Sequence, residues 1–130
     1  MTSMMNEKEY MNDLKMGFEQ AQERSWSEFR DTPDVAGIYA IKNDEKIVYI
    51  GETRSIHDRL THHYNRNGSA LKDKIEDHSG LDADTYLSKC TFKCFPVKLG
   101  RIELEEVLIK AYDPIFNNYK LRKRYKKQAV

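Results

Sequence analysis

The sequence predicts a small α+β domain, in which a three-stranded, mixed or antiparallel sheet is flanked by helices and preceded by an extra N-terminal helix. Two short β-rich runs, 35–41 and 47–50, lie close enough together to indicate a hairpin. A third apolar run, 91–99, predicts another strand, and apolar residues at helical spacing occupy the stretches around the strands. A chain of 130 residues can bury one modest core, so we expect a single small domain.

The expected N-terminal helix covers 5–24, where Met11, Leu14, Phe18 and Ala21 recur at steps of three and four residues. This apolar stripe is narrow, and most of the other residues in the segment are polar or charged. We expect the stripe to pack on the rest of the domain, with a contact between two copies of the chain as the alternative.

The elements that follow are separated by turn and capping signals. Asp31-Thr32-Pro33-Asp34 predicts a loop before the hairpin, and Ser55 begins a helix with Asp58 three residues further on. Pro96 places the third strand at an edge or a bulge, and Asp113-Pro114 ends the last helix. Three helices are therefore predicted after the hairpin: the first begins at Ser55, the second covers 69–78 and the third covers 101–112.

The composition excludes several classes of protein. Hydrophobic residues make up 39% of the chain, which is enough for a folded core. No apolar run approaches the ~20 residues that span a bilayer, and the N-terminus has no basic region followed by an apolar stretch. Two cysteines, Cys90 and Cys94, make neither a disulfide framework nor a zinc site. We therefore expect a soluble, cytoplasmic protein that does not bind membranes.

The charges are unevenly distributed, although the formal net charge is only +1. Residues 1–36 hold eight acidic side chains against four basic ones. The C-terminal tail, 119–130, is basic, and its cations are Lys120, Arg122, Lys123, Arg124, Lys126 and Lys127. Because cations that meet phosphates release condensed counterions, this tail is predicted to bind nucleic acid, with a merely solvated terminus as the alternative.

The most informative stretch is the hairpin, which carries Gly37-Ile38-Tyr39 in its first strand and Tyr49-Ile50-Gly51 in its second. Side chains alternate between the two faces of a strand, so the length of the turn decides where the two tyrosines point. A three-residue turn over 43–45 places Tyr39 directly opposite Tyr49 on one face. A two-residue turn places the tyrosines on opposite faces.

Four further polar residues are candidates for the same site. Arg59 and His63 are four residues apart, so they share a helix face. Glu105 lies between apolar positions of the last helix, where a carboxylate needs a binding partner, and Asn117 follows the turn after that helix. Taken singly, each of these residues is also typical of ordinary packing or of a solvated surface. Together with the two phenols, they form the kind of set that phosphodiester hydrolysis requires.

This combination resembles the GIY-YIG nuclease family over residues 35–118. Both halves of the name-giving motif are present without substitution, and Arg59 and His63 follow where the family has its helix arginine and, in many members, a histidine. The segment 104–110 resembles the family's metal-carboxylate helix, and Pro114-Ile115-Phe116-Asn117 is similar to the end of the nuclease domain in the excision-repair protein UvrC. The resemblance implies an N-terminal helical extension at 1–34, a nuclease domain at 35–118 and a basic tail at 119–130.

The resemblance also implies a metal-dependent endonuclease that acts on DNA, expected to be double-stranded, and leaves 5′-phosphate and 3′-hydroxyl ends. In this scheme Glu105 holds one divalent ion, Mg²⁺ with Mn²⁺ as a substitute, and Tyr39 activates or aligns the attacking water with help from Tyr49. Free tyrosine titrates at about 10, so Tyr39 can act as a base only if its pKa is lowered by the ion and by a neighbouring cation. The other implied roles are charge neutralisation by Arg59, proton transfer or phosphate contact by His63, and orientation of the site by Asn117.

Two features depart from the family pattern. Glu52 follows the second motif, where basic or neutral residues are common, and it is expected either to hydrogen-bond Arg59 or to weaken DNA binding locally. We also expect no separate DNA-binding domain, so target choice falls to the core, the termini, the loop around 64–90, or a second copy in a homodimer. This organisation is typical of small stand-alone phage or bacterial members, or of restriction-type members.

Two other hypotheses compete with this one. The same scaffold can serve as a cleavage-silent module that binds nucleic acid or protein, although the complete set of site residues argues against such a module. The acidic N-terminal helix can also inhibit an active enzyme by lying over a cationic groove.

Overall fold

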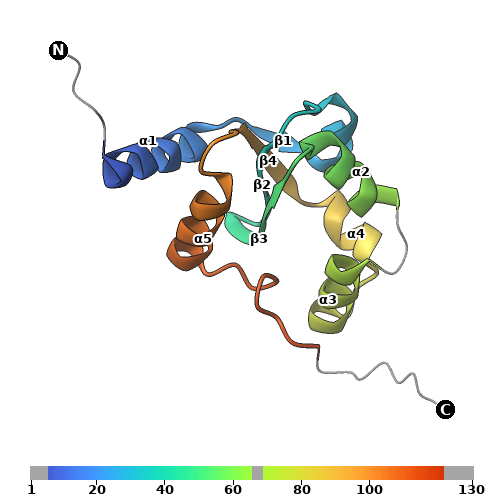
Figure 1. The fold of residues 1–130 in the computed structure, drawn as a ribbon. Coiled ribbons are helices and arrows are strands. Elements are labelled where there is room, and N and C mark those ends of the chain that lie inside the picture. The colour runs from blue at the N-terminus through green and yellow to red at the C-terminus, as the bar shows by residue number, and fades with distance from the viewer. Residues whose placement is uncertain (1–5, 66–68, 122–130) are drawn as a thin grey trace.

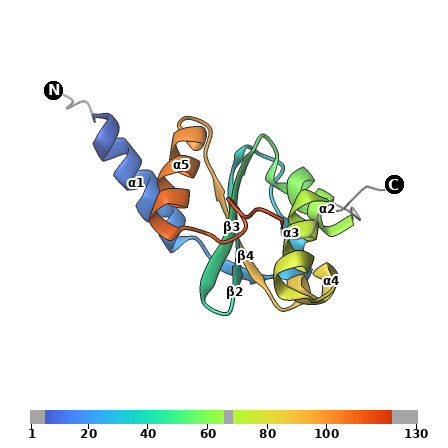
Figure 2. The same cartoon turned by 90° about the horizontal axis from the view of Figure 1, so that it is seen from below.

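The structure, a computed structural model that describes residues 6–65 and 69–121, is an antiparallel sheet between two groups of helices (Figures 1 and 2). The elements in chain order are α1 (Glu7–Gln20), β1 (Glu23–Ser25), the 3₁₀ helix η1 (Trp26–Asp31), β2 (Gly37–Asn43), β3 (Lys46–Thr53), α2 (Ile56–Asn65), α3 (Ala70–Ser79), α4 (Ala83–Ser88), β4 (Thr91–Pro96) and α5 (Arg101–Tyr112). Helices α1 and α5 lie on one side of the sheet, and α2, α3 and α4 lie on the other (Figure 2). The predicted α+β class, with its helix-flanked sheet and N-terminal helix, is confirmed.

The sheet has the strand order β1-β4-β2-β3, and each neighbouring pair is antiparallel. The sequence predicted only β2, β3 and β4. The fourth strand, β1, overlaps the end of the range expected to be helical, because α1 ends at Gln20 and Glu23–Ser25 then pairs with β4. Helix α4 was also not predicted; Asp82 caps it by accepting a hydrogen bond from the N–H of Thr85 at 3.2 Å. Both elements are too short to produce a periodic pattern.

The β2–β3 hairpin has a two-residue turn. Asp44 and Glu45 form it, with φ values of 54° and 73°, the left-handed conformation that such turns require. On the sequence argument alone, a turn of this length places Tyr39 and Tyr49 on opposite faces of the sheet. Of the two turn lengths that the sequence left open, the structure has the two-residue one, and Tyr39 lies opposite Gly51 rather than Tyr49.

A β-bulge reverses the consequence of the short turn. Ile41 pairs with Tyr49, but the next residue of β2, Lys42, pairs with Ile47, so Val48 is an extra residue in β3. An extra residue flips the alternation of the side chains beyond it. The two tyrosines of the motif consequently point to the same face of the sheet, as the three-residue turn would also have achieved.

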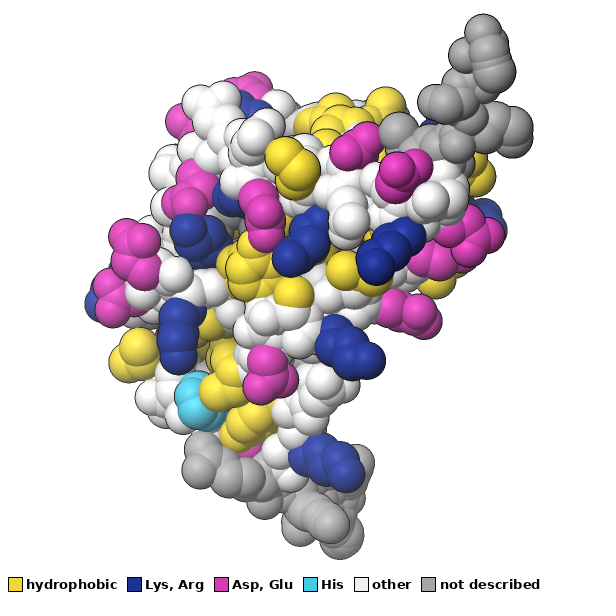
Figure 3. All heavy atoms as spheres, turned by 90° about the vertical axis from the view of Figure 1, so that its left-hand side faces the viewer, with side chains coloured by type: hydrophobic (Ala, Val, Ile, Leu, Met, Phe, Trp, Pro, Cys, Tyr) yellow, Lys and Arg dark blue, Asp and Glu magenta, His cyan; other side chains and the backbone are white. Residues whose placement is uncertain are grey.

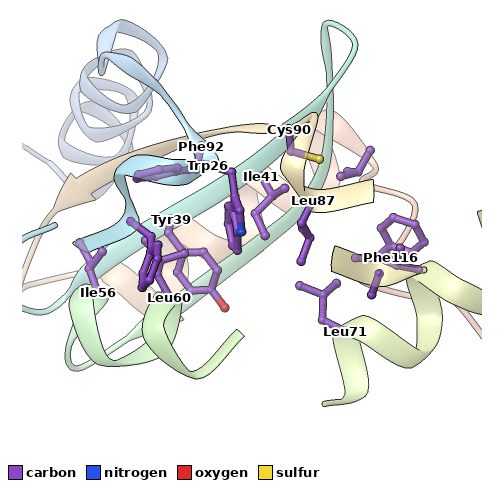
Figure 4. Packing of buried hydrophobic residues seen from close by; sticks show 14 residues of the cluster. Trp26, Tyr39, Ile41, Ile56, Leu60, Leu71, Leu87, Cys90, Phe92 and Phe116 are labelled. Atoms are coloured by element: carbon purple, nitrogen blue, oxygen red, sulfur yellow. The ribbon is translucent and has the colours of Figure 1, made fainter. Parts of the chain in front are cut away.

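Strand β2 is buried on both faces because helices cover both sides of the sheet. On the side of α1 and α5, the core contains Phe18, Ile38, Ala40, Ile50, Leu104 and Leu108. On the side of α2, α3 and α4, the larger core includes Trp26, Tyr39, Ile41, Ile56, Leu60, Leu87, Phe92 and Phe116 (Figure 4). The alternation along β2 therefore sends Tyr39 toward α2 and its neighbours Ile38 and Ala40 toward α5.

Helix α1 is an integral part of the domain. Phe18 is fully buried, and the ammonium group of Lys93 donates to the carbonyl oxygens of Phe18 and Glu19 at 3.4 and 2.8 Å, where it caps the end of α1. The hydroxyl of Tyr10 donates to the carbonyl oxygen of Leu99 at 2.8 Å. The predicted packing of this helix on the domain is confirmed. Because α1 lies on the face opposite to Tyr39, its contacts favour a structural role over inhibition.

The surface on the side of α1 and α5 mixes both signs of charge. Figure 3 shows Lys and Arg side chains interspersed with Asp and Glu among hydrophobic patches on this face. A mixed surface of this kind has no single-sign field that would steer a polyanion. Within 6–65 and 69–121, no helix combines the length and the apolar character needed to cross a bilayer.

Candidate active site

Tyr39 and Gly51 belong to the two halves of the motif and lie opposite each other in the hairpin. A Cβ atom on Gly51 would stand 2.5 Å from both Cζ and Oη of Tyr39, closer than real side chains approach. A Cβ atom on Gly37 would likewise overlap the backbone of Phe95 in the neighbouring strand. The motif glycines are therefore needed where the Tyr39 ring crosses β3 and where β2 meets β4.

Three rings meet on the α2 side of the sheet. Ring centroids are 6.0 Å apart for Tyr39 and Tyr49, 5.7 Å for Tyr39 and His63, and 6.0 Å for Tyr49 and His63. The Tyr39 hydroxyl lies 2.9 Å from Nε2 of His63. Tyr39 has no exposed surface, whereas Tyr49 is half-buried. The phenol nearer to solvent is therefore that of Tyr49.

Burial sets the protonation states of this cluster. It raises the pKa of Tyr39 well above the ordinary value, with a further increase from neighbouring Tyr49, and it lowers the pKa of His63 to about 4. Near neutral pH a protonated phenol thus faces a neutral imidazole. The Tyr39 hydroxyl and Nε2 of His63 share a hydrogen bond, and whether Nε2 or Nδ1 carries the imidazole hydrogen decides which group donates. This Nδ1 is buried and has no hydrogen-bond partner among the residues that the structure describes.

The positive charge of Arg59 acts on the whole ring cluster. Arg59 is exposed on α2, one turn before His63. Burial raises the pKa of Tyr39 and of Tyr49, and the guanidinium of Arg59 opposes part of this increase. The same positive charge adds to the decrease in the pKa of His63 that burial causes. Arg59 also lines an open hollow, whose other walls are Thr53, Ser55, Asp58 and His62. This cation is placed where an anionic group could approach the tyrosines.

Glu105 approaches the cluster from α5. Its Oε2 accepts a hydrogen bond from the N–H of Glu52 at 3.1 Å, at the end of β3. Burial raises the pKa of Glu105, while the hydrogen bond from the Glu52 backbone opposes this increase. Its negative charge in turn raises the pKa of Tyr39 and of Tyr49, so the carboxylate stands within electrostatic reach of both phenols.

Asn117 fixes the backbone between the two motif residues Tyr49 and Gly51. Its Nδ2 donates to the carbonyl oxygen of Ile50 at 2.7 Å, and its Oδ1 accepts from the N–H of Ile50 at 2.9 Å. The N–H of Phe116 donates to the carbonyl oxygen of Val48, the bulge residue, at 2.9 Å. The amide thus pairs with the open edge of β3 as another strand would, and it orients Tyr49 rather than facing a substrate.

The structure brings five predicted residues, Tyr39, Tyr49, Arg59, His63 and Glu105, into one electrostatically coupled group and places Asn117 behind it. Lys120 is exposed, and the other predicted cations of the tail, Arg122, Lys123, Arg124, Lys126 and Lys127, lie outside the described residues. Of the two alternatives expected for Glu52, the hydrogen bond to Arg59 is wrong. Glu52 pairs instead with Arg101, Nε to Oε1 at 2.9 Å. Arg101 was not among the predicted site residues, although its position four residues before Glu105 was a signal.

The donor set fits a magnesium ion better than a transition metal. Mg²⁺ keeps several waters and is commonly bound by one or two carboxylates plus substrate phosphate. Glu105 supplies such a carboxylate, half-buried and with only Oε2 engaged by the Glu52 N–H. Within 6–65 and 69–121, no three His, Cys, Asp or Glu side chains gather as a metal cage. Glu105 could therefore hold a hydrated Mg²⁺, whereas the described residues form no zinc-type cage.

The lowered pKa of His63 predicts a stability that falls in acid. The pKa is about 4 in the folded chain and about 6.5 in an unfolded one, so between these values the unfolded state binds more protons. The free energy of unfolding then rises with pH through this window, and the contribution of His63 is lost as pH falls from 6.5 to 4. The expected difference is about 3 kcal/mol. Urea unfolding of the wild type and of His63→Gln at pH 7 and pH 4.5 measures it; an equal loss in both proteins would contradict the prediction.

Comparisons with known proteins agree with this geometry. Residues 35–120 match the model of the GIY-YIG catalytic domain. UvrABC system protein C of Fusobacterium nucleatum subsp. nucleatum is 25% identical over 87 residues, which are 67% of this chain and 14% of that protein. The same protein of Thermus thermophilus is 28% identical over 85 residues, 65% of this chain and 13% of that protein. The chain thus spans about one-seventh of the length of these curated relatives.

Solved structures give the same result. The GIY-YIG N-terminal endonuclease domain of UvrC from Thermotoga maritima, bound to its catalytic magnesium ion, is 26% identical with a TM-score of 0.53, over 70% of this chain and 92% of that one. A Tyr-to-Phe point mutant of that domain, bound to its catalytic divalent cation, is 25% identical with a TM-score of 0.54, over 72% and 93% of the two chains. The family model covers well over half of the chain, and this protein therefore belongs to the GIY-YIG family.

Proposed function

We propose that this chain is a DNA endonuclease that hydrolyses phosphodiester bonds with one divalent ion and leaves 5′-phosphate and 3′-hydroxyl ends. The observation that carries the proposal is the convergence of two phenols, a guanidinium and a carboxylate, Tyr39, Tyr49, Arg59 and Glu105, whose charges act on one another. These four groups come from four different elements, β2, β3, α2 and α5. They suit a reaction that needs water activation and stabilisation of negative charge.

Burial assigns the two tyrosines different tasks. A water molecule can reach Tyr49, which is half-buried, but not Tyr39, which has no exposed surface. In our proposal, Tyr49 contacts the attacking water and Tyr39 supports Tyr49 from behind, which exchanges the roles that the family resemblance implied. Tyr39 hydrogen-bonds the neutral His63 at Nε2, and this contact holds the Tyr39 ring in place behind Tyr49.

The charged residues act on the phosphate. Arg59, exposed beside the ring cluster, neutralises the negative charge that develops on the phosphate oxygens. Glu105 holds the divalent ion, Mg²⁺ in our proposal and Mn²⁺ as a substitute, and the bound ion supplies Lewis-acid stabilisation of the same charge. Asn117 keeps Ile50 in place and so holds Tyr49 in its orientation.

A plasmid assay tests the proposal directly. Incubation of the purified chain with supercoiled plasmid should give nicked or linear DNA in Mg²⁺ or Mn²⁺ and none in EDTA. One site cuts one strand, so a double-strand break needs two molecules or a homodimer acting together. The opposite outcome is a plasmid that stays supercoiled with either ion while the chain still binds DNA in a gel-shift assay. That result would support the cleavage-silent binding module.

The basic tail is expected to strengthen binding without taking part in cleavage. Deletion of 120–130 removes Lys120 together with the five cations outside the described residues. Each phosphate contact that is lost should reduce the slope of log affinity against log salt by about 0.9, because fewer counterions are released. Binding to a fluorescent duplex between low and high salt measures this slope. An unchanged slope would show that the tail is only a solvated end.

A further inference from the structure

Glu52 contacts α5 at two points. Its backbone N–H donates to Oε2 of Glu105 at 3.1 Å, and its carboxylate Oε1 accepts from Nε of Arg101 at 2.9 Å. Arg101 and Glu105 are four residues apart, so they lie one turn apart on the same face of the helix. Glu52, at the end of β3, therefore binds Arg101 through its side chain and Glu105 through its backbone N–H.

The Arg101–Glu52 pair is partly withdrawn from water. The two side chains are 22% and 29% exposed, and Nη1 of Arg101 also donates to the carbonyl oxygen of Lys98 at 3.4 Å. Charges in such a setting attract each other more strongly than on an open surface. Without Glu52, the partly buried guanidinium of Arg101 would be unpaired, and an ion pair with another carboxylate would stabilise it. The carboxylate one helical turn away is that of Glu105.

An arginine paired with Glu105 would compete directly with a cation. The guanidinium would neutralise the carboxylate and occupy the oxygen atoms that a divalent ion requires. We propose that Glu52 is a positioning residue: by pairing with Arg101 it keeps the guanidinium away from Glu105 and so leaves this carboxylate free for the metal ion. This inference rests on the metal-binding role given to Glu105 in the proposed function.

Three variants separate this role from a direct contact between Glu52 and the ion. Glu52→Met removes the charge and the acceptor at similar length, Arg101→Met removes the competing cation, and the third variant combines both changes. Mg²⁺ is titrated into each DNA-free protein, and the NMR signal of the residue-52 amide, which donates to Glu105, reports occupancy. Residues that support a metal ligand typically change affinity by 10- to 100-fold.

We expect Glu52→Met to weaken Mg²⁺ binding by at least ~10-fold, Arg101→Met to change it by less than ~3-fold, and the double variant to return within ~3-fold of the wild type. The rescue is the decisive result, because Arg101 matters only when Glu52 is absent. A double variant as weak as Glu52→Met would overturn the proposal and make Glu52 a direct partner of the ion. Normal affinity in Glu52→Met would overturn it as well.

A matched control and a metal-free measurement complete the test. Arg24 and Glu28 form a comparable pair, Nε to Oε1 at 3.2 Å, outside the site, so Glu28→Met should leave Mg²⁺ binding unchanged. Without metal, the Nε–H signal of Arg101 in Glu52→Met should differ from the signal in the Glu52→Met, Glu105→Ala double variant. In that double variant Arg101 has lost Glu105, the carboxylate with which the proposal pairs it when Glu52 is absent. If this signal does not shift, the proposal is overturned, even if the ion binds. Absence of Mg²⁺ binding in the wild type, with this shift present, would instead count against the proposed nuclease function alone.

Discussion

Replacement of Glu105 with alanine is expected to abolish plasmid cleavage while DNA retention stays nearly intact. Among the described residues, Glu105 is a carboxylate whose negative charge raises the pKa of both motif tyrosines. A bound divalent ion supplies several kcal/mol of charge stabilisation, so its loss should reduce the rate by roughly 10³-fold or more. The nicking rate of supercoiled plasmid in Mg²⁺ measures the first effect, and a gel-shift assay in EDTA measures the second.

The neighbouring residue supplies the control for this variant. Glu106 is exposed on the next position of α5, so Glu106→Ala removes an equal charge from the same helix without touching the Glu52 backbone. It should retain most of the activity. Thermal unfolding of both variants shows whether either substitution harms the fold. Unchanged nicking in a folded Glu105→Ala protein would refute the metal role of this residue.

Much of the fold was predictable because it is encoded locally. The helix over 101–112 was predicted with the same boundaries as α5, since the apolar periodicity and the stop signal of Asp113-Pro114 both lie within the segment. Asp113 adopts φ of 48° at the end of this helix, as a C-terminal cap does. The hairpin was likewise predicted from two short β-rich runs. Signals of this kind do not depend on distant parts of the chain.

The side-chain parity of the hairpin could not be predicted in this way. The bulge at Val48 decides which face Tyr49 occupies, and the carbonyl of Val48 is bound by the N–H of Phe116, far along the chain. The burial of Tyr39 depends on α2, which supplies both Leu60 and the hydrogen-bonded His63. Such contacts are tertiary, so the residues of the site could be listed from the sequence but their division of labour could not.

The second large effect is the loss of cleavage rate expected when the hydroxyl of Tyr49 is removed, because Tyr49 and Tyr39 have different roles in the proposed reaction. Tyr49→Phe should reduce the cleavage rate by ~10²–10⁴, the usual contribution of a group that transfers a proton in the transition state. The ring remains to pack, so only the hydroxyl is removed. Tyr39→Phe should reduce the rate less, because Tyr39 has no exposed surface and reaches the water only through Tyr49. Single-turnover cleavage at saturating DNA compares the two variants, with binding measured separately.

The two tyrosine variants also need a control that loses a phenol hydroxyl outside the site. Tyr112 donates its hydroxyl to Glu19 at 2.8 Å on the opposite side of the sheet, so Tyr112→Phe should cleave at the wild-type rate. If Tyr39→Phe loses more of the cleavage rate than Tyr49→Phe, then Tyr39 is the residue that contacts the attacking water. In that case α2 would have to move away from β2 when DNA binds. Because the Tyr39 hydroxyl is held by His63 at 2.9 Å, such a movement would have to break that hydrogen bond first. The order of the two rate losses therefore distinguishes a site that is already formed from one that opens on its substrate.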